Sequence, residues 1–275
     1  MAPHPKDAPP PYSKHPTEGT ATIATGSQDP PPFAAQRQNQ PPIPRQFPPA
    51  FNMYIESRQH YHIGEHQAAP LYAVTLARPV LFSSSSRPDV LLHCGPSHQS
   101  PALAAVERVG FDRCLTVTLP PLLVAGSGSG AGAGAGVQER VETPTGFGDG
   151  PYTFVVEAGP GQRREAFAWR RSRGETVEAL GGRASGWKLV RLRTDAPSGL
   201  EGPGRAVFAG GGACAGDGKE VVAVWAWATM SLTKKLRFRF LGSGVSGVLG
   251  ERWAVMAVAT ALWIFERERR QKEDR

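Results

Sequence analysis

The sequence is poor in cysteine and lacks the cysteine spacing of a metal site or a disulfide framework. Cys94, Cys114 and Cys214 are the only cysteines among 275 residues, and an odd number cannot pair completely. The N-terminus has no charged segment followed by an apolar one, so we expect no secretory signal. These absences favour a reducing compartment, and we predict a cytoplasmic or nuclear location.

Helical patterns are also missing over most of the chain. Before residue 251 we find no convincing stretch with the apolar period of an amphipathic helix. Strands alternating with helices, which mark a parallel α/β sheet, are therefore not expected. No nucleophile stands beside a recognisable acid or oxyanion motif, so we predict that the protein is not an enzyme and uses no cofactor.

The first fifty residues are rich in proline instead of core-forming residues. Fourteen of the 26 prolines lie between Pro3 and Pro49, with few aliphatic residues among them. Such a segment cannot bury enough apolar surface to offset the entropy lost on folding. We therefore predict a disordered, proline-rich arm over residues 1–50, partly in the polyproline II conformation.

One motif in this arm indicates a protein partner. Pro9, Pro10, Pro11 and Tyr12 match the Pro-Pro-x-Tyr pattern that WW domains bind. A polyproline segment docks in the aromatic groove of these domains at low entropic cost, and the tyrosine fixes the register. A WW-domain protein is thus a candidate partner, and a chance match in a proline-rich tail is the alternative.

Residues 51–275 are expected to form one domain made mainly of short strands. Clusters of Gly, Pro, Ser and Asp separate the apolar runs at spacings typical of a sandwich or barrel. Two glycine-rich stretches, near residues 123–148 and 194–218, indicate flexible insertions. The predicted strands are Phe51–Glu56, Leu71–Arg78, Asp89–His93, Cys114–Leu119, Tyr152–Glu157, Glu165–Arg171, Trp187–Arg193, Arg205–Phe208, Glu220–Ala228 and Lys235–Leu241.

The most apolar segment lies near the C-terminus. Residues 253–265 are apolar apart from Thr260, and a helix that is apolar on every face must be surrounded by protein or lipid. The strand 221–228 is apolar on both faces, so both should be covered. We therefore predict a mainly β fold: a closed antiparallel β-barrel of about twelve strands around a hydrophobic C-terminal helix. Closure also removes the edge strands.

The alternative is a tail-anchored membrane protein that uses helix 251–268. Its basic flanks suit an anchor. However, the thirteen residues 253–265 span only about 20 Å at helical rise, short of the roughly 30 Å hydrocarbon core. The barrel is therefore favoured.

Two motifs resemble ligand sites but have simpler explanations. Gly242, Gly244 and Gly247 fit the dinucleotide-binding pattern, yet we expect no parallel strand after the following helix, so a glycine-rich turn is favoured. In His60-x-His62, alternation places both imidazoles on one face of a strand, as in some metal sites.

Glu65 and His66 follow this pair in the sequence, but no fourth ligand is obvious. His93-Cys94 with His98 is a weaker signal. Surface or packing histidines are the favoured explanation for both groups, and we predict no metal site.

The net charge of +7 and the pI of about 9.6 permit contact with anionic partners without identifying one. Lys234, Lys235, Arg237 and Arg239 form the densest basic strand and are our candidate surface for an anionic ligand. A second basic group spans residues 163–173. A solvated barrel exterior is the default explanation for both, and nucleic-acid binding is not supported.

Four segments resemble a known superfamily. Residues 220–227, EVVAVWAW, and 249–256, LGERWAVM, carry the likeness, and 51–54, FNMY, and 186–191, GWKLVR, add to it. The chain resembles fungal proteins of the tubby C-terminal-like superfamily over roughly residues 51–268. LURP-one-related proteins and phospholipid scramblases belong to the same superfamily.

The resemblance implies a twelve-stranded barrel around a hydrophobic C-terminal helix, and chiefly a binding role. Tubby domains bind phosphoinositides. Scramblases have acylated cysteine clusters and calcium-binding segments, neither of which is evident here, and no site residue can be transferred from the superfamily. We therefore predict a monomeric, non-enzymatic binding or adaptor protein that contacts an anionic phospholipid or a protein partner.

Overall fold

The computed structural model describes residues 46–77, 88–108, 114–120, 136–144, 150–159, 161–192 and 213–274. The candidate WW motif, the predicted strand Arg205–Phe208 and most of both glycine-rich stretches lie outside these ranges. The strands are β1 (Ala50–Ile55), β2 (His60–Gly64), β3 (Tyr72–Leu76), β4 (Val90–His93), β5 (Ala102–Arg108), β6 (Cys114–Leu119), β7 (Val137–Glu142), β8 (Tyr152–Ala158), β9 (Arg163–Ser172), β10 (Gly186–Arg191), β11 (Ala213–Cys214), β12 (Glu220–Trp227) and β13 (Lys234–Phe240). The helices are α2 (Glu175–Glu178), α3 (Gly242–Ser246) and α4 (Glu251–Glu273).

Twelve of the described strands form the closed antiparallel β-barrel that the sequence predicts. From β1 to β10, each strand pairs with the next along the chain. Strand β13 pairs with both β1 and β12, and pairing between β10 and β12 closes the ring. Strand β11 pairs only with the end of β12, outside the ring. Because the ring is closed, its strands leave no long edge for another chain to pair with.

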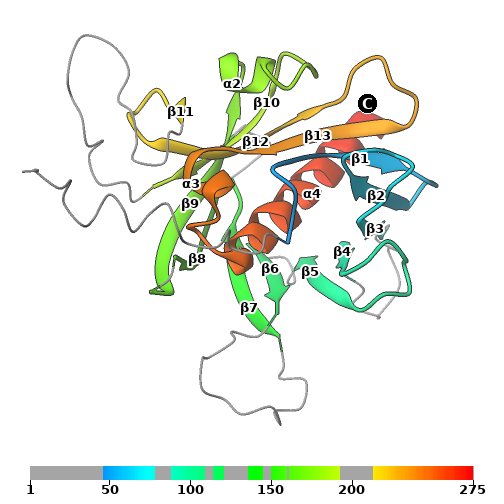
Figure 1. Ribbon diagram of the computed structural model, residues 1–275, viewed down its shortest axis with the longest axis horizontal. Helices are drawn as coiled ribbons and strands as arrows, with labels where there is room; N and C mark the ends of the chain where they lie inside the picture. The colour runs from blue at the N-terminus through cyan, green and yellow to red at the C-terminus, as the bar shows by residue number, and fades with distance from the viewer. Residues whose placement is uncertain are drawn as a thin grey trace, which may run out of the picture. The chain divides into compact units, whose positions relative to one another are not determined.

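Helix α4 fills the centre of this barrel, as Figure 1 shows. Each residue from Val255 to Phe265 is at most 4% exposed, so the strands provide the covering that an all-apolar helix requires. The one polar residue in this stretch, Thr260, accepts a hydrogen bond of 2.9 Å from the indole of Trp169 and donates one to the carbonyl of Met256. The predicted position of the helix is therefore confirmed.

Polar contacts hold both ends of α4 to the strands. At the N-terminal end, Arg252 pairs with Glu157 at 2.9 Å and with Glu139 at 3.2 Å. At the C-terminal end, the Glu268 carboxylate accepts hydrogen bonds from Arg171, Trp187 and Trp227.

A second, smaller cluster covers the outer face of β12. Val224 and Ala226 are fully buried there against Val177 and Leu180, which lie in or just after α2. The predicted cover on both faces of this strand is thus confirmed, because α4 lies on one side and this cluster on the other.

The predicted boundaries of the arm and of the two insertions differ from the structure in three places. Phe47, assigned to the arm, is 2% exposed and packs on Tyr72 with 4.7 Å between ring centroids, so the barrel begins before residue 51. Strand β7 falls inside the range 123–148 that we assigned to an insertion, and β11 lies inside the range 194–218. Those assignments are wrong for these strands, whose short or mostly polar sequences gave no apolar signal.

The glycine-rich segment after β13 contains the short helix α3. Buried Glu220 accepts hydrogen bonds from the backbone N–H and the hydroxyl of Ser243, at 2.7 Å each. Gly247 then ends the helix with φ of 80°, a conformation that favours glycine. Among the described residues, no helix is long and apolar enough to cross a membrane.

Candidate functional site

A β-bulge determines which basic side chains of β13 lie together. Along most of β13 the side chains alternate, and Arg237 and Arg239 share the outer face, as predicted. Near the start of the strand the register with β1 shifts, so that Lys234 instead of Lys235 lies opposite Tyr54. The Lys235 amino group donates to a nearby backbone carbonyl at 2.8 Å.

Three of the four predicted residues, Lys234, Arg237 and Arg239, line one pocket of about 380 Å³ on the outer surface of the barrel; Lys235 is not among its lining residues. Strand β1 forms the other wall, and the residues after β2 and α2 contribute the ends. The lining residues are Ala50, Phe51, Asn52, Glu65, His66, Leu180, Lys234, Arg237, Phe238 and Arg239, which we call the basic pocket.

One carboxylate, that of Glu65, lines the basic pocket with its three cations, but it forms no ion pair with any of them in the described part of the chain. Among the described residues, Lys234, Arg237 and Arg239 make no ion pair. The second basic group differs, because Arg164 pairs with Glu139 and Glu157 at 2.7 and 2.6 Å. Arg170 and Arg171 of the same group pair with Asp217 and Glu268, at 2.6 Å each. Three arginines of the second group are thus paired with carboxylates, whereas the three cations of the basic pocket form no ion pair with a described residue.

Two of these cations are held in place by neutral groups. Arg237 donates from Nη1 to the carbonyl of Leu180 at 2.8 Å, and its buried Nε has no partner among the described residues. The Lys234 amino group lies 5.7 Å from the centre of the Tyr54 ring. Partial burial, and then the charge of Arg237, hold the pKa of Lys234 below its ordinary value. An anion in the pocket would relieve this repulsion and give Arg237 Nε a partner.

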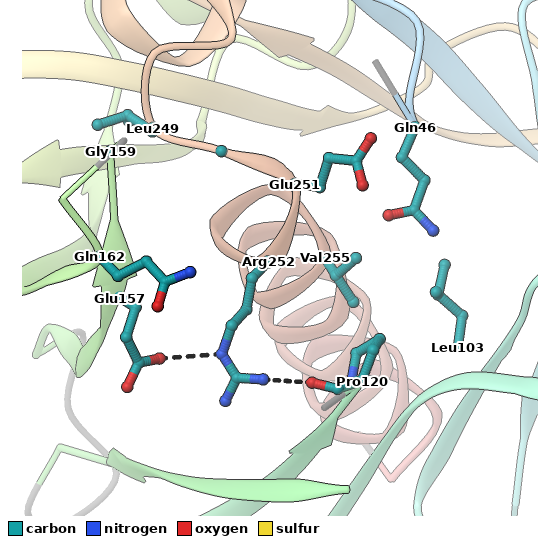
Figure 2. A pocket seen from close by; sticks show the side chains of 11 residues that line it. Gln46, Leu103, Pro120, Glu157, Gly159, Gln162, Leu249, Glu251, Arg252 and Val255 are labelled. Carbon is teal, nitrogen blue, oxygen red and sulfur yellow. Dashed lines mark hydrogen bonds and ion pairs between the residues drawn. The ribbon is translucent and has the colours of Figure 1, made fainter. Parts of the chain in front are cut away.

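A second hollow, of about 490 Å³, lies at the N-terminal end of α4, and Figure 2 shows its lining side chains. Arg252 crosses it, bound to Glu157 on one side and to the Pro120 carbonyl on the other. Arg252 is the one cation among the described lining residues, and it is already paired. Gln46, Gln162 and Glu251 are further polar side chains in its lining, and we assign it no function.

The structure separates His60 and His62 from Glu65 and His66, so that the two pairs lie at different sites. Glu65 and His66 line the basic pocket. His60 and His62 lie instead with residues that the sequence did not group with them, Glu56 and His98. Only the fold brings these together, because the loop before β5 returns to the end of β1.

These four residues include three that could hold a metal. Donor atoms of Glu56, His62 and His98 all lie within 4.8 Å of one another. The His60 ring lies beside them, 4.3 Å from that of His98 between centroids. The grouping itself gives no evidence of catalysis.

No protein-family model, curated protein or solved structure matches this chain.

Proposed function

We propose that this protein is a non-enzymatic binding protein whose basic pocket holds the anionic headgroup of a phospholipid. The observation that carries the proposal is that Lys234, Arg237 and Arg239 line one pocket while making no ion pair among the described residues. Phosphate and phosphoinositide groups suit such a site, because guanidinium groups hydrogen-bond phosphate oxygens in a fixed geometry and lysine adds a point charge.

The fold supports the same class of function. Membership of the tubby C-terminal-like superfamily is a proposal that rests on the four resembling segments, and a barrel around a C-terminal helix is the architecture it implies. A tail anchor is less well supported, since the apolar side chains of α4 are already buried by strands. We also propose a cytoplasmic or nuclear location, in keeping with three free cysteines.

The proposal is tested by co-sedimentation of the full chain with lipid vesicles. Phosphatidylcholine vesicles, alone and with phosphatidylserine or a phosphoinositide, are compared at physiological salt. We expect binding only when anionic lipid is present, strongest with the phosphoinositide. A soluble inositol phosphate should compete if the headgroup is what binds. Binding that does not depend on lipid charge, or no binding to any vesicle, would overturn the proposal and leave a protein partner as the alternative.

A double variant connects such binding to the pocket. Each basic residue near an anionic surface contributes about 1 kcal/mol, so Lys234→Gln with Arg239→Gln should weaken vesicle binding by roughly 30-fold. Both side chains lie on the outer face of the barrel, so the variant should unfold at the same urea concentration as the original chain.

A further inference from the structure

A cluster of imidazole and carboxylate groups lies on the barrel surface near the ends of β1 and β2. His98 Nε2 is 2.9 Å from Glu56 Oε2, and His62 Nε2 is 3.7 Å from the same oxygen. The side chains of His62 and His98 are about three-quarters buried, whereas that of Glu56 is half exposed. One carboxylate oxygen thus faces two imidazole nitrogens at a place that solvent can reach.

A chain of hydrogen bonds orients the His98 ring. The Ser100 carbonyl can only accept, so His93 Nδ1, 2.8 Å away, carries a proton. In the neutral ring, His93 Nε2 then accepts from the Thr75 hydroxyl at 3.1 Å. Since this hydroxyl has only one proton, its oxygen accepts from His98 Nδ1 at 3.2 Å. His98 Nε2 is hydrogen-bonded to the Glu56 carboxylate at 2.9 Å, and because a carboxylate only accepts, this nitrogen carries a proton when no metal is bound.

A metal ion at this place would replace the proton on His98 Nε2 and be held by the same nitrogen and carboxylate oxygen, which lie 2.9 Å apart. Hydrogen bonds that fix the second nitrogen of an imidazole are also what prepare histidines as metal ligands. Buried His93 and half-buried Thr75 have this role here, because they hold the His98 ring without being ligands themselves.

We propose that Glu56, His62 and His98 form a binding site for a divalent transition metal of the zinc class. Two imidazoles and one carboxylate are a ligand set that zinc uses where one position stays open. Ligands of a tetrahedral zinc lie roughly 3.3 Å apart, so the observed spread of up to 4.8 Å requires only small side-chain rotations. The half-exposed Glu56 is free to make them.

Two neighbours affect this site. His62 Nε2 also faces the Pro96 carbonyl at 3.1 Å, so metal binding would displace that contact and move the proton to Nδ1. His60 is bonded through Nδ1 to the Ser57 hydroxyl at 3.1 Å and is close enough to become a fourth ligand after a rotation. Calcium and magnesium prefer all-oxygen sites and should not compete.

Titration of the full chain, free of any affinity tag, with Zn²⁺ and Co²⁺ tests the site. We expect one metal ion to bind per chain with micromolar or tighter affinity, and Co²⁺ to give the visible absorption bands of a nitrogen-ligated site. A rise in the unfolding temperature with Zn²⁺, absent with Mg²⁺, should accompany binding. Failure to bind either metal below about 100 µM would overturn the proposal.

Variants locate the bound ion. His62→Ala and His98→Ala should each weaken binding by about 100-fold or more, and Thr75→Val by about 10-fold through the lost orientation of His98. His66→Ala and Cys94→Ser are matched controls that should leave binding unchanged. Because Glu56 is half exposed, Glu56→Gln should fold normally. Its metal affinity can therefore be measured even if a histidine variant fails to fold. Undiminished binding by Glu56→Gln and the folded histidine variants would contradict the assignment.

Discussion

Single buried carboxylates hold the barrel together at the points where its strands meet α4. Glu268 accepts from Arg171 of β9 at 2.6 Å, from Trp187 of β10 at 2.9 Å and from Trp227 of β12 at 2.6 Å. Strands β10 and β12 form the pair that closes the ring. The Glu268 side chain of α4 is therefore hydrogen-bonded to both strands of this pair. Loss of the carboxylate would remove the acceptor that the indole N–H groups of Trp187 and Trp227 share.

We therefore expect Glu268→Gln to destabilise the protein by about 2–4 kcal/mol, because an amide has only one acceptor oxygen and carries no charge. Urea unfolding followed by tryptophan fluorescence measures this. Glu273→Gln, on the exposed last turn of α4, is the control and should change the stability by less than about 0.5 kcal/mol. Equal effects of the two variants would contradict the role of Glu268.

A second carboxylate makes the stability of the protein depend on pH. Burial raises the pKa of Glu157, but hydrogen bonds from its own backbone and from Arg252 outweigh this, and the pKa is lowered from 4.5. A carboxyl with a lowered pKa in the folded state stabilises the fold above its unfolded pKa. That stability is lost as the pH falls through the folded pKa.

The protein should therefore lose stability below about pH 4.5, and Glu157→Gln should flatten this decline. Urea midpoints between pH 3 and 6 measure both. The variant is expected to be less stable at pH 6 and to approach the original chain at pH 3. Parallel curves would show that Glu157 makes no such contribution.

At the scale of elements, the barrel and its central helix were predictable, because both follow from burial of apolar surface. The all-apolar segment 253–265 must be covered by other parts of the chain. The strand 221–228 is apolar on both faces, so both of its faces must be covered as well. Strand β7 was not predictable, since Val141 is its only fully buried apolar residue and its other positions are mostly polar. The bulge that brings Lys234 into the basic pocket depends on pairing with a strand far away in the sequence.

The same limit applies to the candidate sites. Arg237 and Arg239 could be placed together from strand alternation alone. His98 could not be joined to Glu56 and His62, because no periodic pattern connects the segment after β4 with the adjacent strands β1 and β2.

Helix α4 should be indispensable for folding, because it supplies the core of the barrel. A chain truncated after Gly250 is expected to lack a cooperative unfolding transition and to bind hydrophobic dyes. A synthetic peptide of residues 251–275, added in trans, should restore folding at least in part. A truncated chain that unfolds cooperatively without the peptide would contradict this account.

At the scale of the whole molecule, the excess of positive charge is less informative than its distribution. The net charge of +7 includes many arginines that are neutralised in ion pairs around α4. The basic pocket differs because its three cations have no such partner among the described residues. Binding through it should weaken as salt rises, since partly exposed charges are screened.

The most direct test compares two neighbouring positions of β13 for their affinity toward phosphoinositide vesicles. Arg239→Gln removes a cation from the basic pocket, whereas Lys235→Gln removes one from the same strand outside it. The account predicts that the first variant binds about 5-fold more weakly and that the second stays within about 2-fold of the original chain. Equal weakening by both variants would show that only overall charge matters, and no change in either would contradict the pocket's proposed role.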